Sequence, residues 1–303
     1  MTTTNDQIVN NYIQLQTERI ERQLHALFPS DWNIPDRLLE AMNYSLSAGG
    51  KRMRPILAIA AAEALGAEGS TVLPIACAIE LIHTYSLIHD DLPAMDDDDF
   101  RRGVPTNHRV FGEAMAILAG DGLLTHAFYM ITEAGLAGGI PAERSLQIVR
   151  ELSEYAGPRG MVGGQAADIL GEQGLTELAQ LEYIHLHKTS DLIVCSLRAG
   201  GHAALANSNQ LAALTRYGTC IGLAFQIQDD VLDVIGDERK LGKKTQADAK
   251  EGKVTYPFLL GIEACIAKVE ELTQAGKDAI SAGGIPNPDK LIALAEVLMK
   301  RDH

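Results

Sequence analysis

The repeat of apolar residues every three or four positions is the feature that most restricts the fold of this chain. The repeat runs along nearly the whole sequence, as in Leu38, Met42 and Leu46. The alternation of apolar and polar residues that is typical of half-buried strands is absent. Ala-rich segments such as residues 56–67 are apolar around most of a helical circumference, which predicts helices buried among other helices. The sequence therefore predicts an all-α fold with an inner layer of helices.

Gly-Gly and Gly-Pro pairs interrupt this pattern, and we expect them to mark breaks between helices. These positions are Gly49-Gly50, Gly138-Gly139, Gly157-Pro158, Gly200-Gly201 and Gly283-Gly284. A length of 303 residues would allow two domains, but no linker, composition shift or low-complexity run divides the chain. We therefore expect residues 1–303 to form a single domain.

Composition and charge exclude several classes of protein. With 46% hydrophobic and 22% charged residues, the chain has enough apolar material for a large core. A formal net charge of -14 argues against nucleic acid as the main partner, because binding to phosphate backbones relies on a basic surface. The first residues lack a secretion signal, and no run approaches the roughly 20 apolar residues of a membrane span. These features predict a cytoplasmic protein without a membrane span.

Cysteine and histidine do not have the spacing of a zinc or redox site. Four cysteines lie far apart in apolar sequence and are expected to be buried free thiols: Cys77, Cys195, Cys220 and Cys265. His185 and His187 are two residues apart, which places them on different faces of a helix. A metal site built on this pair is therefore not expected.

The segment 225–237 is predicted to be a helix with one acidic side. At about 100° per residue, one sector holds the polar residues Gln226, Asp229, Asp230, Asp233 and Asp237. The opposite side holds Ile227, Val231, Leu232, Val234 and Ile235. Carboxylates four residues apart repel one another on a helix. A positive group is therefore expected to offset the repulsion on this face.

The segment 86–103 is a second acidic stretch, with six aspartates and a proline, Pro93, that interrupts the helical pattern. Several carboxylates without thiolates or paired histidines suit Mg²⁺, which keeps water ligands and also takes phosphate oxygens. The glycine and the terminal glutamate of an EF-hand calcium loop are missing. The two acidic stretches therefore predict a magnesium site that binds a phosphate compound.

Basic residues occur in four places that could complete such an anion site: Lys51, Arg52 and Arg54 within 49–55; Arg101 and Arg102; Lys188, next to Thr189; and Lys243 and Lys244. Pro55 is a residue favoured in the first turn of a helix, where free amides and cations can hold an anion. Together with the aspartates, these groups predict binding of a diphosphate.

The order of these motifs resembles that of the trans-prenyltransferases, and specifically of the bacterial farnesyl diphosphate synthases. The matching segments are "GGKRMRP", "YSLIHDDLPAMDDDDFRRG", "GMVGGQAADI", "HKTSDL", "FQIQDDVLDVIGD" and "KVTYP". The resemblance implies an isoprenoid-synthase-type helical bundle around a deep central cavity, and a homodimer. It also implies Mg²⁺-dependent head-to-tail condensation of isopentenyl diphosphate with dimethylallyl or geranyl diphosphate, which yields farnesyl diphosphate.

The resemblance also implies roles for individual residues. The principal ligands of a cluster of three Mg²⁺ ions would be Asp90, Asp96 and Asp229. Residues that bind metal-bound water or support the ligands would be Asp91, Asp230 and Asp233. The allylic diphosphate would be held by Arg101, Lys188 and Lys243, with Thr189 and Gln226 beside the reacting centre. The pocket for isopentenyl diphosphate would consist of Gly50, Lys51, Arg54, His83 and Arg102.

Product length is expected to depend on Tyr85, beside Ser86. Tyr85 precedes Asp90 by five residues, or roughly 7.5 Å along a helix. An aromatic residue at this position, together with the Pro93-Ala94 extension, resembles the pattern of the farnesyl-producing members of the family. In those members the aromatic ring forms the floor of the pocket. One departure is Gln246, where many relatives carry glycine in the lysine-rich loop.

Three other functions compete with this interpretation. A geranylgeranyl diphosphate synthase would share every motif except the pocket floor. A terpene cyclase would have a different second motif and generally an aromatic-rich pocket, whereas this chain has only 5% aromatic residues. A non-catalytic isoprenoid-diphosphate-binding subunit would keep the fold, although the intact acidic and basic motifs argue against it.

Overall fold

The computed structural model describes residues 4–171, 177–235 and 254–299, and most of these residues are helical. The helices of the first half are α1 Thr4–His25, α2 Asp36–Ser47, α3 Met53–Ala64, α4 Gly69–Asp90, α5 Asn107–Phe111, α6 Glu113–Leu136 and α7 Ala142–Ala156. Those of the second half are α8 Met161–Gly171, α9 Leu178–Ile184, the π-helix η1 His185–Ser190, α10 Asp191–Ala203, α11 Ser208–Ile235, α14 Tyr256–Leu260, α15 Ile262–Ala282 and α16 Asp289–Met299. The predicted all-α fold is confirmed.

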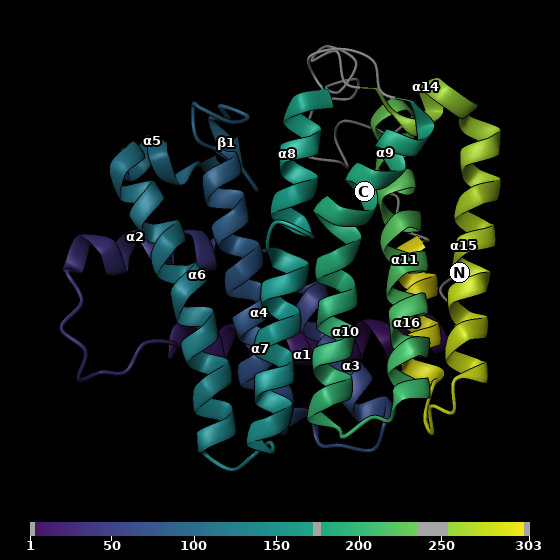
Figure 1. Cartoon of the computed structure of the whole chain (residues 1–303). Coiled ribbons are helices and arrows are strands. Elements are labelled where there is room, and N and C mark those ends of the chain that lie inside the picture. Colours follow the sequence, from purple (N-terminus) through teal and green to yellow (C-terminus); the bar gives the residue numbers. More distant parts are fainter. Residues whose placement is uncertain (1–3, 172–176, 236–253, 300–303) are drawn as a thin grey trace.

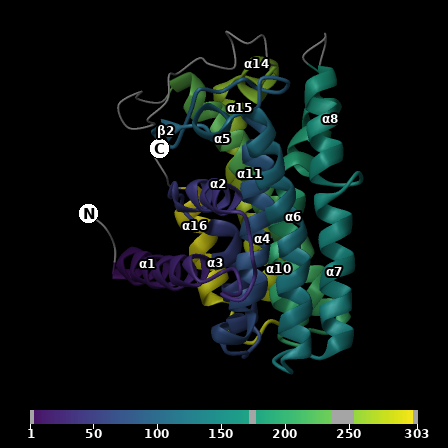
Figure 2. The ribbon, with the colours of Figure 1, turned by 90° about the vertical axis from the view of Figure 1, so that its left-hand side faces the viewer.

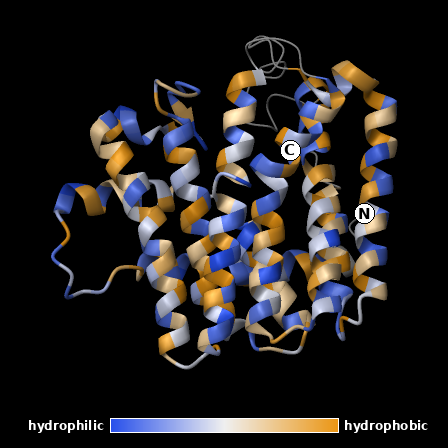
Figure 3. Cartoon of the chain, viewed as in Figure 1, coloured by the Kyte–Doolittle hydropathy of each residue, from blue (hydrophilic) through white to orange (hydrophobic). Residues whose placement is uncertain are grey.

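Long helices form an upright bundle, in which α4, α6, α7, α10, α11 and α15 run side by side (Figure 1). Helix α1 crosses this bundle on one side, where it contacts α3, α4 and α16 (Figure 2). Apolar residues are distributed over all of the upright helices, and none of them is polar throughout (Figure 3). This distribution is expected where helices bury apolar surface against one another on several sides.

The inner layer predicted from the Ala-rich segments is present in α3 and α4. In α3 every residue from Ile56 to Ala62 is buried, and α4 packs against α3, α6 and α10. Small side chains let these helices approach closely and still exclude water. The four cysteines are free and buried, as predicted.

The pair Gly200-Gly201 corrects our prediction that each glycine pair ends a helix. Both residues are buried within α10. A Cβ atom on Gly200 would lie 2.1 Å from the carbonyl oxygen of Ala58 in α3, so this position has no room for any side chain. Glycine at this position therefore serves close packing of two helices and not a break between them.

Two helices also correct the expectation that no segment reaches the length and apolarity of a membrane span. Helices α4 and α6 are both long and apolar enough to cross a bilayer. They pack against each other, and each has further partners within the bundle, such as α3 for α4 and α2 for α6. Packing inside the bundle therefore accounts for the apolar composition of α4, whereas α6 also leaves Ile117, Leu118 and Leu136 exposed.

A short antiparallel ribbon joins the first acidic stretch to α5. Strand β1 (Phe100–Arg101) pairs with β2 (Val104–Pro105), and both residues of the connecting turn, Arg102 and Gly103, have positive φ angles of 54° and 80°. Two such residues are the signature of a type I′ hairpin turn. The strands are too short to produce an alternating pattern, so the sequence did not reveal them.

We expect Gly200→Ala to lower the free energy of unfolding by about 1–3 kcal/mol, because the new methyl group would have to push α3 and α10 apart. The matched control is Gly139→Ala, at a site where the nearest atom to a Cβ would be 3.8 Å away. Chemical denaturation of both variants measures the difference. Equal stabilities would show that α10 tolerates the methyl group.

Candidate active site

The two acidic stretches meet at one cavity of about 630 Å³. Helices α3, α4, α8, η1 and α11 contribute to its walls, with Asp90 from α4 and Asp229 from α11. The other predicted site residues in the lining are Arg54, His83, Tyr85, Ser86, Arg101, Lys188, Thr189 and Gln226. Segments more than 130 residues apart in the chain thus supply carboxylates and cations to the same space.

Asp90 is the carboxylate most affected by its surroundings. Its pKa is raised from 3.8 to about 6, mainly by burial; the charges of Asp96 and Asp91 contribute to this rise, while Lys188 and Arg101 oppose it. Asp96 is exposed outside the cavity lining, but its backbone N–H donates to the carbonyl of Asp90 at 2.9 Å. The loop after α4 therefore folds back over the helix end and holds several carboxylates close together.

Asp91 faces away from the large cavity. Its buried carboxylate accepts a hydrogen bond from Arg101 Nε at 2.5 Å and lines a small cavity of about 30 Å³ beneath the hairpin. Burial raises the pKa of Asp91, whereas the hydrogen bond from Arg101 lowers it. Asp91 therefore orients Arg101, and Arg101 lies between the small cavity and the large one, which it also lines.

The second acidic motif differs from the simple two-sided helix expected from the sequence. Asp230 and Asp233 are buried, whereas Val234 and Ile235 are exposed. Asp230 Oδ2 accepts from the backbone N–H of Tyr256 at 2.9 Å, and Asp233 Oδ1 has no hydrogen-bond partner within the described part of the chain. The expected separation of faces fails because α10, η1, α14 and α15 all pack against α11.

The π-helix η1 brings Lys188 and Thr189 to the cavity. Gly164 of α8 and Gly222 of α11 allow this close packing, since a Cβ on them would lie 2.2 Å from Lys188 N and 2.5 Å from Ser190 Oγ, respectively. Lys188 Nζ donates to Asp168 Oδ2 at 2.6 Å. Single-turn π-helices inside α-helices are frequent at functional sites, where the wider turn redirects side chains.

A second group of cations lies beside His83. Arg54 Nη1 donates to His83 Nε2 at 3.3 Å, and the carbonyl of Gly49 accepts from Arg102. Burial lowers the pKa of Arg54 to about 10. Burial also takes the pKa of His83 well below 6.5, and the charges of Arg54 and Arg102 reinforce this effect. His83 is therefore a neutral acceptor within a strongly cationic wall.

The remaining predicted residues have different positions. Lys51 is exposed and is not part of the cavity lining. Gly50 lies against Arg102, whose Cζ would be 2.7 Å from a Cβ at that position. Lys243 and Gln246 lie outside the described residues. Asp237 of the second motif does too.

Sequence reasoning assigned no role to Gln165 or Asp168, although both belong to the motif "GMVGGQAADI". Gln165 lines the cavity with its buried Oε1 unpartnered among the described residues, and Asp168 holds Lys188. Phe225, immediately before Gln226, is a further lining residue. Gln165, Asp168 and Phe225 all lie within the motifs quoted for the family resemblance, and this position could have revealed them.

Comparison with known proteins identifies the family. The polyprenyl synthetase family model matches residues 35–281. The chain belongs to the polyprenyl synthetase family. The predicted resemblance to the trans-prenyltransferases is therefore confirmed.

Several relatives of this polyprenyl synthetase span nearly its whole length. It is 48% identical to the farnesyl diphosphate synthase of Geobacillus stearothermophilus, covering 97% of this chain and 98% of the relative. It is 45% identical to the chloroplastic geranylgeranyl pyrophosphate synthase of Catharanthus roseus, covering 89% and 75%. A crystal structure of an FPP/GFPP synthase from Zymomonas mobilis superposes with a TM-score of 0.85 at 33% identity, covering 96% and 98%.

The carboxylates of this chain supply only part of the coordination shell of a Mg²⁺ ion. Among residues 4–171, 177–235 and 254–299, no three His, Cys, Asp or Glu side chains come close enough to form a ready-made metal site. Mg²⁺ rarely requires such a cage, because it keeps several waters and takes one or two carboxylates plus substrate phosphates. Asp90 and Asp229 on the walls of one cavity are suited to that mode, in which the diphosphate supplies the missing oxygens.

We expect Asp90→Asn to raise the melting temperature of the protein in EDTA at pH 7.5. Because the folded state holds the pKa of Asp90 near 6, ionisation above that pH disfavours folding; the penalty vanishes below about pH 4, where both states are protonated. The gain should therefore shrink between pH 6 and pH 4 in thermal scans. Asp121→Asn, on the exposed side of α6, is the control. A variant that melts at or below the wild-type temperature at pH 7.5 contradicts the expectation.

Proposed function

We propose that the chain is a farnesyl diphosphate synthase, which condenses isopentenyl diphosphate with dimethylallyl and then geranyl diphosphate. The observation that carries this proposal is the shared cavity, where Asp90 and Asp229 lie together with Arg101 and Lys188. Relatives named farnesyl diphosphate synthase, at 48% and 44% identity, support it.

Asp90, Asp96 and Asp229 would hold Mg²⁺ together with the allylic diphosphate, and Asp91, Asp230 and Asp233 would support them. Mg²⁺ held by these carboxylates would supply Lewis acidity, which stabilises negative charge on a leaving diphosphate. Lys188 and Arg101 contribute positive charge at the same place, as Lys243 is also expected to do. The hydrogen bond from Lys188 Nζ to Asp168 Oδ2, at 2.6 Å, orients the lysine side chain.

The apolar part of the cavity protects the allylic cation. Met161, Val162, Ile169 and Phe225 line the space beside Thr189 and Gln226. Exclusion of water is required there, because water would trap the cation as an alcohol. Breaking the allylic C–O bond leaves the diphosphate with the electron pair, so no nucleophilic side chain is needed.

The cationic wall beside His83 would hold isopentenyl diphosphate. Arg54 and Arg102 supply charge, and Gly50 lets the backbone approach Arg102 closely. A contact of the exposed Lys51 with this substrate stays a prediction. The alkene of isopentenyl diphosphate then forms a C–C bond to the allylic cation, and loss of a proton restores a new allylic diphosphate. We expect the departing diphosphate to accept that proton.

Homodimer formation and cytoplasmic location stay predictions. Ile117 and Leu118 are exposed on α6, and Val110 is exposed just before it. An apolar helix face of this kind supports contact with a second copy of the chain.

The decisive experiment is a turnover assay with purified protein, radiolabelled isopentenyl diphosphate and each allylic starter. We expect labelled farnesyl diphosphate with Mg²⁺ and no product with EDTA. Asp229→Asn should reduce kcat by two orders of magnitude or more, roughly what removal of one electrostatic stabiliser costs. Binding of both diphosphates without turnover would instead favour a non-catalytic subunit.

Product length distinguishes this proposal from a geranylgeranyl diphosphate synthase, a function that some relatives carry in their names. Tyr85 is 7% exposed and lines the cavity next to Ser86. We expect Tyr85→Ser to deepen the cavity and shift products from fifteen to twenty or more carbons, as measured by chromatography of the dephosphorylated alcohols.

The control for this variant is Tyr129→Ser, which removes a tyrosine that packs against Trp32 outside the cavity. The control should leave product length unchanged. Fifteen-carbon products from Tyr85→Ser would show that this ring does not limit elongation.

A further inference from the structure

Arg52 does not join the anion site that its neighbours form. Its side chain is 1% exposed, and Nη1 donates to Glu80 Oε1 at 2.9 Å while Nη2 donates to the carbonyl of Leu46 at 2.5 Å. Glu80 is equally buried, with 2% of its side chain exposed. Lys51 is exposed and Arg54 lines the cavity, so three basic residues of one short segment point to three different environments.

Two features of Arg52 are unfavourable for stability. A buried ion pair loses the hydration of both charges and often contributes less than apolar side chains of the same volume. Arg52 also has a left-handed backbone conformation, with φ 49°. Strain of this kind persists where the surrounding structure requires a particular geometry, and it concentrates at functional sites.

The ion pair connects the loop before α3 to the helix that carries His83. Glu80 and His83 are three residues apart on α4, so they share a face. Arg54, two residues after Arg52, reaches His83 at 3.3 Å. On the other side, the carbonyl of Gly49 accepts a hydrogen bond from Arg102. One anchor therefore sets the position of the loop and of Arg54 against α4.

Electrostatics gives Glu80 a second effect. Burial lowers the pKa of His83, and the charges of Arg54, Arg102, Arg101 and Arg52 lower it further. The charge of Glu80 acts in the opposite direction on Arg54 and Arg102, whose positive forms it favours. Glu80 thus offsets part of the repulsion among these arginines.

We propose that the ion pair between Arg52 and Glu80 is a positioning element for isopentenyl diphosphate: it holds the loop 49–52 and Arg54 in register with His83, and neither partner touches the substrate. The inference rests on the proposed function of this site and assigns to it two residues buried behind the cavity wall.

The test is the double variant Arg52→Met/Glu80→Leu. Replacing both charges by apolar groups of similar volume commonly preserves folding, which single removal of one partner does not. We expect a folded protein whose KM for isopentenyl diphosphate rises about tenfold or more, the effect of loosening one charge-assisted contact. The KM for the allylic diphosphate should change less than about twofold, because Lys188 and Arg101 are anchored elsewhere.

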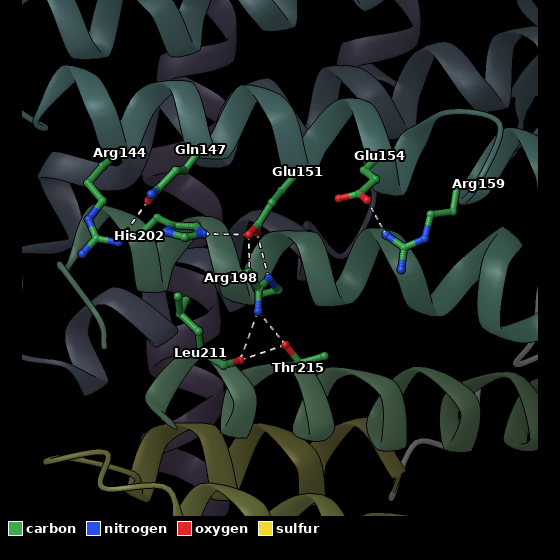
Figure 4. A network of polar contacts seen from close by, with 9 residues as sticks. All are labelled: Arg144, Gln147, Glu151, Glu154, Arg159, Arg198, His202, Leu211 and Thr215. Carbon is green, nitrogen blue, oxygen red and sulfur yellow. Dashed lines mark hydrogen bonds and ion pairs between the residues drawn. The ribbon is translucent and has the colours of Figure 1, made fainter. Parts of the chain in front are cut away.

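The matched control is Arg198→Met/Glu151→Leu. These residues form an ion pair between α7 and α10, with Arg198 Nε 2.8 Å from Glu151 Oε2, and belong to a polar network with His202 and Thr215 away from the cavity (Figure 4). Loss of this pair should leave both KM values unchanged. A rise in the KM for isopentenyl diphosphate in the control as well would show that the effect is general loosening of the bundle.

A binding measurement separates failure of this inference from failure of the proposed function. Calorimetric titration of isopentenyl diphosphate in EDTA probes the cationic wall alone, since the aspartate motifs then repel the ligand. Wild type that binds but does not condense overturns the proposed function only; the double variant should still bind about tenfold more weakly. Equal affinity and equal KM in the two proteins overturn the positioning role.

If the double variant fails to fold, Arg52→Lys provides the second test. Lysine keeps the charge next to Glu80 but lacks the planar fork that reaches Glu80 and Leu46 together. We expect a folded variant with the same selective rise in KM for isopentenyl diphosphate, to about threefold or more. An unchanged KM overturns the proposal.

Discussion

The burial of the Asp90 carboxylate at the end of α4, reinforced by repulsion from neighbouring carboxylates, is the constraint on which the rest of the site depends. Asp90 is drawn out of water by burial and feels Asp91 and Asp96 nearby, so its pKa rises to about 6. Lys188 and Arg101 offset only part of this cost. Divalent cations that bring a diphosphate would relieve this cost, in line with the function that we propose.

The bundle maintains this arrangement by close contacts between helix backbones. Gly164 and Gly222 let α8 and α11 enclose the π-helix η1, which points Lys188 into the cavity. Arg101 donates a hydrogen bond to Asp91, and Lys188 donates one to Asp168. The cations are therefore positioned before any ligand arrives, which reduces the entropy lost on binding.

Two cationic regions of the cavity are organised differently. In one region, Lys188 and Arg101 each pair with a carboxylate. Each of these cations could bind a diphosphate in addition to its carboxylate. Beside His83, Glu80 and Asp91 offset part of the charge of the converging arginines, and Glu80 also binds Arg52. We expect the arginines there to bind an anion without a metal ion. This difference fits the proposed function, in which both substrates are diphosphates but only the C–O bond of the allylic one is broken.

The sequence by itself determined the helical fold, the buried cysteines, and the residue types that line the cavity. Helical periodicity follows from local spacing, and the motifs carry their residue types in the order "GGKRMRP" to "KVTYP", so both can be read without coordinates. Tertiary structure alone decided which way each side chain points. Arg52 turns inward while Arg54 lines the cavity, and Asp230 binds the backbone of Tyr256 while Asp229 faces the site. Gly200 lies inside a helix for the same reason. These outcomes depend on which helices pack against a segment, and such long-range contacts leave no trace in the local pattern of residues.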